Sequence, residues 1–387
     1  MFQLPKNVWI LSIGQALLMS ISTLVVFVGG IIGGNLAPTE KLATLPVALS
    51  IVGTAVAVYP VTSFMKWAGR RKAILAAIAA SVLIALMAGY SIISSNFYLF
   101  CFSTFLFGIN NASVLQFRFA AMESVRPELM PNAASAVLIG GIVAAFIGPE
   151  LALLGKDILP SPFAGSFVLI AVVLVIAFVV LTFYNNTKIE EDYTGETSRS
   201  IVEIAKQPVF WVAVLGAATG YAIMSFIMTA TPISMHVMDG HSLSDTKFVI
   251  QSHIVAMFAP SIITGWIINK FGIPKMMIAG LLSYVLCLVI AYSDHLFINY
   301  WISLFLLGIG WNFLFIGGTA LLPSSYLPQE KFKVQALNEL MVFGSQAIAS
   351  LSAGWIIYAV GWEAMLSLVI PFILLQFGIM AVWKYKS

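Results

Sequence analysis

Long apolar stretches follow one another along the chain and are separated by short polar segments. An α-helix needs about 20 predominantly apolar residues to cross the hydrocarbon core of a bilayer, and twelve stretches reach about that length. The pattern therefore indicates an all-α membrane protein whose main elements are transmembrane helices. We predict twelve spans at residues 8–34, 42–65, 73–94, 98–122, 132–155, 163–184, 208–235, 247–268, 276–293, 298–322, 334–358 and 362–383.

The composition agrees with this class of protein. Hydrophobic residues make up 60% of the 387 residues and charged residues only 9%, whereas about 25% of the residues of a soluble domain are charged. The net charge of +3 does not indicate a nucleic-acid partner. Cys101 and Cys287 lie in different apolar stretches and do not indicate a disulfide framework. We expect the lipid bilayer as the partner and a monomer as the working form.

One longer polar segment interrupts the apolar pattern after the sixth stretch. Residues 185–207 contain five acidic residues together with Lys188, Arg199 and Lys206, which is typical of a solvated linker. The segment divides the chain into an N-terminal six-helix half (residues 1–184), a cytoplasmic linker (185–207) and a C-terminal six-helix half (208–387).

The basic residues indicate how the chain is oriented in the membrane. If the N-terminus lies in the cytoplasm, 15 of the 19 Lys and Arg residues fall on the cytoplasmic side and three on the outer side, while Arg118 lies within a span. Cytoplasmic loops of membrane proteins carry such an excess of positive charge. We therefore expect a multi-pass protein of the bacterial inner membrane with both termini in the cytoplasm.

The two halves of the chain repeat each other. The segment from Thr62 to Lys72 follows the second span, and a similar segment from Gly265 to Lys275 follows the eighth. Gly108-Ile109 in the fourth span is likewise matched by Gly308-Ile309 in the tenth. Matches about 200 positions apart indicate a duplicated six-helix unit, and we expect the two loops to take part in gating. The gating residues predicted there are Gly69, Arg70, Arg71, Gly265 and Gly272.

These loops resemble the Gly-x-x-x-Asp-Arg-x-Gly-Arg-Arg motif of the major facilitator superfamily, and the resemblance extends over the whole chain. Lys66 and Asn269 stand where the motif has Asp, and Thr62 replaces the first Gly of the N-terminal copy. The resemblance implies a twelve-helix fold built from two six-helix pseudo-repeats. It also implies a secondary transporter that works by alternating access.

Two spacings in the seventh and eighth spans point to soft metal ligands. Met224 and Met228 are four residues apart in one span, and His253 and Met257 are four residues apart in the next. An i, i+4 step places both side chains of a pair on one helix face, and thioether and imidazole ligands suit cuprous copper. We therefore predict a copper site formed by these four residues. Packing of the methionines and a structural hydrogen bond of the histidine are the alternatives.

Several stretches resemble a narrower branch of the superfamily, the CcoA-like transporters. They are residues 116–121, 224–232, 253–261 and 308–313. The branch includes bacterial copper importers and riboflavin importers of the RfnT type, so the resemblance implies one of these two substrates. In the copper importers the Met pair and the His/Met pair resemble a membrane-embedded metal site.

Other residues within the spans suit an organic substrate better than a metal ion. Trp311 and Asn312 lie near the middle of the tenth span and offer stacking and hydrogen bonding to a flat heterocycle. Tyr221 lies one turn from Met224, and Arg118 in the fourth span suits an anionic group. We predict that Arg118, Tyr221, Trp311 and Asn312 line a substrate cavity. Helix packing and, for Arg118, an interfacial position are the alternatives.

The remaining sequence features concern the driving force of transport and whether the chain is an enzyme. Carboxylates within spans are the usual carriers of a coupled proton, so we predict Glu339 and Glu150 as candidates for proton coupling. The sequence has no nucleophile motif and no Gly-x-x-x-x-Gly-Lys-Ser/Thr phosphate loop. We therefore do not expect the chain to be an enzyme or to hydrolyse ATP.

We therefore expect an inner-membrane secondary transporter, without a permanently bound cofactor, that imports copper as its substrate from the periplasm. Import of riboflavin or another small organic molecule is the alternative. Export, or sensing without transport, is a less favoured interpretation.

Overall fold

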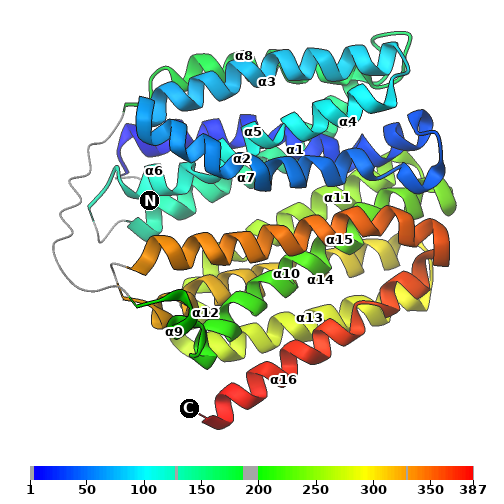
Figure 1. Ribbon diagram of the computed structural model, residues 1–387. Helices are drawn as coiled ribbons and strands as arrows, with labels where there is room; N and C mark the ends of the chain where they lie inside the picture. Colours follow the sequence, from blue (N-terminus) through cyan, green and yellow to red (C-terminus); the bar gives the residue numbers. More distant parts are fainter. Residues whose placement is uncertain (1–3, 127–129, 186–198, 328–329, 387) are drawn as a thin grey trace. The chain divides into compact units, whose positions relative to one another are not determined.

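The structure is a computed structural model that describes residues 4–126, 130–185, 199–327 and 330–386. Within these ranges the chain is helical and contains no β-strand (Figure 1). Its internal contacts divide it into two units. Unit 1 comprises Met1–Ile189 and Ser242–Val255, and unit 2 comprises Glu190–His241 and Ala256–Ser387. Residues 186–198 of the predicted linker lie outside the described ranges.

Unit 1 contains the helices of the first six predicted spans. Residues 98–122, predicted as one span, form three consecutive helices because turns at Phe107 and Gln116 interrupt the helix. The elements are α1 (Lys6–Leu36), η1 (Glu40–Leu42), α2 (Leu45–Ala68), α3 (Arg70–Ile93), α4 (Phe97–Leu106), α5 (Gly108–Leu115), α6 (Phe117–Met122), α7 (Met130–Gly155) and α8 (Ala164–Leu181).

Unit 2 contains most of the second half of the chain. The helix α11 (Leu243–Phe258) begins in unit 1 and ends in unit 2. Within unit 2, α10 packs against both α14 and α15, and α13 packs against α14. Its other elements are α9 (Ile201–Ala205), α10 (Pro208–Pro232), the π-helical turn η3 (Ile233–Met238), α12 (Ser261–Phe271), α13 (Ile273–Ser293), α14 (Phe297–Leu321), η4 (Leu322–Ser325), α15 (Lys331–Ser367) and α16 (Ile370–Lys386).

The lengths of the helices agree with the predicted membrane spans. In the described ranges, 10 helices are long and apolar enough to cross a membrane, or up to 11 if the bent pair α11–α12 is one span. The segment Lys333–Trp383 is one of the 10 although it has 51 residues, and its helix turns at Gly361, where φ is 81°. Because this segment contains the last two predicted spans, the structure is consistent with twelve.

The two loops matched in the sequence have the same backbone geometry. α2 ends at Ala68 and α3 begins at Arg70, with Gly69 between them at φ 85° and ψ 149°. α12 ends at Phe271 and α13 begins two residues later, with Gly272 at φ 84° and ψ 156°. A side chain is strained at such a positive φ. The sequence repeat is therefore also a structural repeat, and it requires glycine at both positions.

The eighth predicted span is broken near its middle. α11 and α12 meet at an angle of 43°, with Ala259 and Pro260 between them. Proline has no N–H group, so it cannot continue the hydrogen bonds of the preceding helix. The break leaves carbonyl groups at the end of α11 that need donors from elsewhere.

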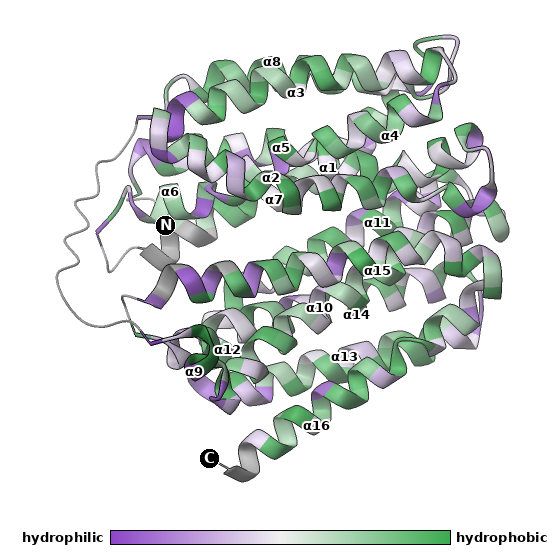
Figure 2. Cartoon of the chain, in the orientation of Figure 1, coloured by the Kyte–Doolittle hydropathy of each residue, from purple (hydrophilic) through white to green (hydrophobic). Residues whose placement is uncertain are grey.

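The helical surfaces are mainly apolar. Figure 2 shows hydrophobic residues along the lengths of the helices, with hydrophilic residues gathered mainly at helix ends and in the connections. Large apolar side chains such as Tyr59, Trp67 and Leu83 are more than half exposed in the isolated chain. Such exposure is expected where lipid, and not water, surrounds a helix.

Candidate functional site

Four aromatic residues from three helices of unit 2 form a cluster. Tyr221 lies on α10, Trp311 and Phe315 on α14, and Phe343 on α15. The Tyr221 ring meets the other three edge-on, with centroids 5.1 Å from Trp311, 4.9 Å from Phe315 and 5.6 Å from Phe343. Trp311 and Phe315 stack at 5.2 Å. We call these four residues the aromatic cluster.

The polar edge of Trp311 is the unusual group in the aromatic cluster. Its side chain is only 3% exposed, yet its indole N–H finds no hydrogen-bond acceptor among the described residues. Burying a donor without an acceptor costs free energy. Tyr221, Phe315 and Phe343 are partly exposed, so the aromatic cluster combines accessible ring surface with one unused donor.

The neighbouring Asn312 has a different role in the structure. Its Nδ2 donates to the Met257 carbonyl and to the Ser261 hydroxyl, each at 2.7 Å. Its Oδ1 accepts from the Thr264 hydroxyl at 3.3 Å. Asn312 therefore supplies hydrogen bonds to the two helix ends that meet at Pro260. Of the predicted cavity residues, Tyr221 and Trp311 are in contact. Asn312 joins α14 by hydrogen bonds to the break between α11 and α12.

The fourth predicted cavity residue lies in the other unit. Arg118 is on α6 of unit 1, and its guanidinium group lies 4.7 Å from the ring centroid of Phe119. A cation beside an aromatic face is stabilised there. Its role toward a substrate stays a prediction.

The predicted copper ligands are all buried but are divided between the units. Met224, Met228 and Met257 belong to unit 2, with exposures of 4%, 7% and 8%. His253 is completely buried and belongs to unit 1. Among the described residues, no group of three or more His, Cys, Asp or Glu side chains is arranged to hold a metal ion. The mixed Met/His site stays a prediction.

The two carboxylates predicted for proton coupling differ in their surroundings. Glu150 near the end of α7 pairs with Lys247 at 2.8 Å, and its side chain is 48% exposed. The Glu150 carboxylate is therefore part of an ion pair that is accessible from outside the protein. Glu339 lies on α15 and is partly buried.

The predicted gating loop of unit 1 is anchored on both sides. Arg70 pairs with Glu123, which directly follows α6, at 2.5 Å. Arg71 donates to the Thr182 carbonyl, which directly follows α8. The two arginines thus connect the α2–α3 turn to the ends of two other helices. In the matching loop of unit 2, Gly272 is the residue with a positive φ between the two helices. A Cβ atom added at Gly265 would have no neighbouring atom within 4 Å.

One strong ion pair in unit 2 was not predicted. The side chain of Glu330, before α15, is fully buried and pairs with Arg199, before α9, at 2.6 Å. The Arg199 guanidinium and the Leu327 backbone N–H, both hydrogen-bonded to it, hold the pKa of this carboxyl at about 2. The same pairing raises the pKa of Arg199. The sequence signal was weak because 131 positions separate the partners.

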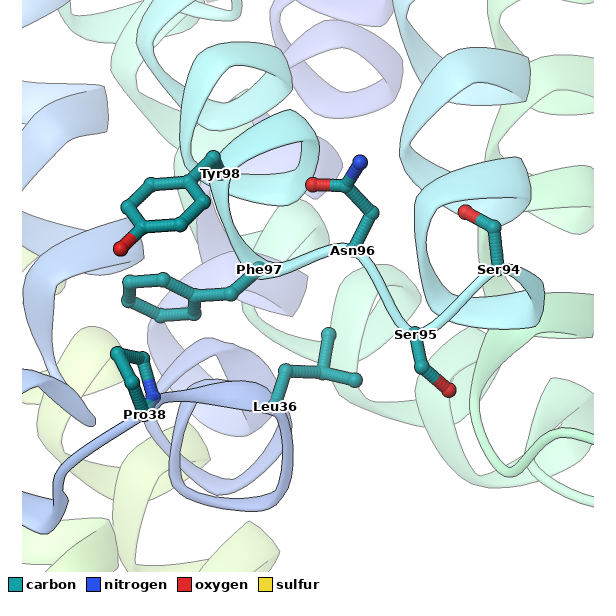
Figure 3. Close-up of a pocket in the computed structure, with 7 residues that line it drawn as sticks. All are labelled: Leu36, Pro38, Ser94, Ser95, Asn96, Phe97 and Tyr98. Atoms are coloured by element: carbon teal, nitrogen blue, oxygen red, sulfur yellow. The ribbon is translucent and has the colours of Figure 1, made fainter.

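A pocket of about 310 Å³ lies in unit 1 at the end of α1 (Figure 3). Its lining contains no charged residue and none of the predicted site residues. Asn96 caps α4 through its side-chain oxygen, which accepts the Leu99 N–H at 3.0 Å. The lining residues are Leu36, Pro38, Ser94, Ser95, Asn96, Phe97 and Tyr98.

Known proteins resemble the chain over nearly its full length. The riboflavin transporter RfnT of Brucella anthropi is 37% identical over 373 residues, which are 96% of this chain and 94% of that protein. The uncharacterized MFS-type transporter YddS of Bacillus subtilis is 29% identical over 85% of this chain and 80% of its own length.

The fold also has a solved counterpart. The crystal structure of a bacterial homologue of the human lysosomal transporter Spinster, in an inward-facing and unoccupied conformation, matches with a TM-score of 0.73. It covers 98% of this chain and 96% of that one at 12% identity. The family model described as Major Facilitator Superfamily matches residues 11–259 and 240–387. This chain therefore belongs to the major facilitator superfamily and is a multi-pass membrane transporter, not an enzyme.

Proposed function

We propose that this transporter carries riboflavin, or a close analogue with the same flat heterocycle, into the cytoplasm. The observation that carries the proposal is the 37% identity to a riboflavin transporter over 96% of this chain. The same comparison does not support copper, which the sequence analysis placed first, and it fits the alternative better.

The aromatic cluster supports a flat substrate. A fused-ring heterocycle binds best against aromatic side chains with a few polar groups that fix its orientation. Tyr221, Phe315 and Phe343 offer ring surface, and the unused indole N–H of Trp311 offers a donor for a ring nitrogen or carbonyl oxygen. In this proposal Tyr221 and Trp311 bind the substrate, and Asn312 positions Trp311 by fixing α14 against the break at Pro260.

The direction and orientation are part of the proposal. The excess of Lys and Arg on one side supports cytoplasmic termini and the inner membrane. The two six-helix repeats support alternating access, in which the substrate site opens to one side at a time. The buried methionines Met224, Met228 and Met257 then serve as packing residues beside the site.

Uptake of radiolabelled riboflavin tests the proposal in bacteria that neither synthesise riboflavin nor have an importer of their own. We expect saturable uptake with the intact protein. Stacking of a base on an aromatic side chain is worth about 1–3 kcal/mol, and a hydrogen bond about 0.5–1.5 kcal/mol. Tyr221→Ala, which removes ring surface, and Trp311→Ala, which removes the donor, should therefore each raise the KM for uptake roughly tenfold.

The matched control is Trp301→Ala, on the same helix but outside the aromatic cluster, where the indole packs beside Phe305. This variant should keep the KM of the intact protein, and each variant's amount in the membrane is measured. Cellular copper is determined in the same cells by mass spectrometry. Copper accumulation that is lost in Met224→Ala and His253→Ala, without riboflavin uptake, would overturn the proposal.

A further inference from the structure

Side chains from three helices of unit 1 form a hydrogen-bonded network. The Ser22 hydroxyl of α1 donates to Oδ1 of Asn111 on α5 at 2.6 Å. Nδ2 of Asn111 donates to the Thr54 hydroxyl of α2 at 3.2 Å. The Thr54 hydroxyl in turn donates to the Ser50 carbonyl of its own helix at 2.8 Å. We call Ser22, Thr54 and Asn111 the midspan polar network.

The network lies near the middle of three membrane spans. Ser22 is close to the centre of α1. Thr54 is at the centre of the candidate span Glu40–Ala68, and Asn111 is near the centre of the candidate span Phe97–Met122. A polar group at this depth costs free energy unless a hydrogen-bond partner satisfies it. Transporters built from two repeats bind their substrates near this depth, so the network is placed where a substrate site is expected.

The network is closed on one side only. Thr54 is 7% exposed, whereas Ser22 and Asn111 are partly exposed. The neighbouring Asn110 gives the contrast, because it is 1% exposed and its Nδ2 donates to the Leu18 carbonyl of α1 at 3.0 Å. Successive residues of an α-helix point about 100° apart. Asn110 therefore joins α5 to α1, while Asn111 faces the accessible side.

The accessible members keep hydrogen-bonding capacity that the network does not use. A side-chain amide has two N–H donors and an oxygen with two lone pairs, and a hydroxyl oxygen also has two lone pairs. Asn111 uses one donor and one lone pair, and Ser22 uses only its O–H. Neither side chain makes a further hydrogen bond within the described part of the chain. The network can therefore both donate to and accept from a hydroxyl group, and it contains no charge that would favour an ion.

We infer that the midspan polar network binds the hydroxyl-bearing chain of the transported molecule. The inference rests on the proposed function, because riboflavin consists of a flat ring system and a neutral chain of hydroxyl-bearing carbons. The donors and acceptors of the network match this chain, as aromatic side chains match the ring system. Asn111 and Ser22 then determine specificity, since they favour flavins that carry the chain over flavins that lack it.

Uptake of radiolabelled riboflavin with unlabelled lumiflavin as a competitor tests the inference. Lumiflavin has the same ring system with a methyl group in place of the hydroxyl-bearing chain. Asn111→Leu should raise the KM for riboflavin about threefold to tenfold, the effect of losing one neutral hydrogen bond. The inhibition constant of lumiflavin should not change, whereas a merely structural role of Asn111 would weaken both ligands alike. Ser22→Ala should act in the same direction with a smaller effect.

The matched control is Ser81→Ala, because Ser81 lies at the centre of α3 and its buried hydroxyl donates to the Ala77 carbonyl of the same helix at 2.7 Å. This variant should keep both constants, and the amount of each variant in the membrane is measured. If Asn111→Leu does not reach the membrane, Ser22→Ala decides the test.

Two negative results are distinguishable. If riboflavin is taken up but the ratio of its KM to the inhibition constant of lumiflavin is unchanged in the deciding variant, this inference is overturned and the proposed function stands. If the unchanged protein takes up no riboflavin, the proposed function is overturned and this inference with it.

Discussion

At the scale of single residues, Glu330 is held in its charged form by its partners. Its side chain is fully buried, and the Arg199 side chain and backbone both donate to it. The pKa of Glu330 lies at about 2, below the ordinary value of 4.5. The unfolded chain therefore takes up the proton first as the pH falls. The stabilisation is complete above about pH 4.5 and is lost between there and about pH 2.

Replacing this carboxylate tests the argument. Glu330→Gln leaves the Arg199 guanidinium without its anionic partner, so we expect a lower Tm at neutral pH and a smaller loss of Tm on acidification toward pH 3. Thermal unfolding of the purified protein at several pH values measures both effects. Glu40→Gln, at an exposed position in η1, is the control and should behave as the unchanged protein. Parallel acid profiles for Glu330→Gln and the unchanged protein would contradict the assignment.

The candidate site was only partly predictable at this scale. Tyr221 and Trp311 stood out because aromatic residues with a polar group are unusual at the centre of a span. Phe315 and Phe343 complete the aromatic cluster, but phenylalanine in an apolar stretch is ordinary packing and carries no signal of its own. The contacts of His295 with Asp239 and Glu363 were not predicted, because 56 and 68 positions separate these residues in the sequence.

At the scale of elements, the turn between two helices is decided by one glycine in each half. Gly69 and Gly272 have nearly the same φ and ψ. No atom lies closer than 3.8 Å to a side chain built at Gly272, so a substitution there is strained through the backbone and not through crowding. The sequence repeat predicted both loops, because the motif contains the glycine that the turn requires.

Gly272→Ala should therefore lower the free energy of unfolding by about 1–3 kcal/mol, because a φ of 84° with a ψ of 156° is a conformation that essentially only glycine adopts. Gly344→Ala, in the interior of α15 with no atom within 4 Å of a built Cβ, is the control. It should be neutral or stabilise by up to about 1 kcal/mol. Denaturation of the two purified variants under identical conditions gives the comparison, and an equal effect of both would refute the strain argument.

Bends within helices were harder to predict than the helices themselves. For most spans the apolar stretches predicted ends within a few residues of the helices, since bilayer thickness sets their length. The twelfth predicted span, 362–383, was wrong in this respect, because it is divided between the end of α15 and α16 (Ile370–Lys386). The interruptions at Phe107 and Gln116 were not predicted, because a stretch of apolar residues indicates how long a helix is but not whether it is continuous. Pro260 was a visible signal, but the 43° bend depends on partners supplied by another helix.

At the scale of the whole molecule, the placement of basic residues makes a prediction about topology. With 15 of 19 Lys and Arg residues on the side of the N-terminus, both ends of the chain should lie in the cytoplasm. A fluorescent protein fused to the C-terminus should fluoresce, and alkaline phosphatase fused there should be inactive. A phosphatase fusion near Asp157, between α7 and α8, should be active. The reverse result would invert the orientation.

The pairing of Pro260 with Asn312 also has a consequence for how such proteins diverge. The proline ends one helix, and the asparagine of another helix supplies the hydrogen bond to the Met257 carbonyl. A lineage that loses the asparagine first exposes that carbonyl to an apolar interior, whereas one that loses the proline first can form a continuous helix, in which the N–H of residue 261 reaches the Met257 carbonyl and replaces the amide. The two positions are therefore expected to change together during evolution, with the proline replaced first.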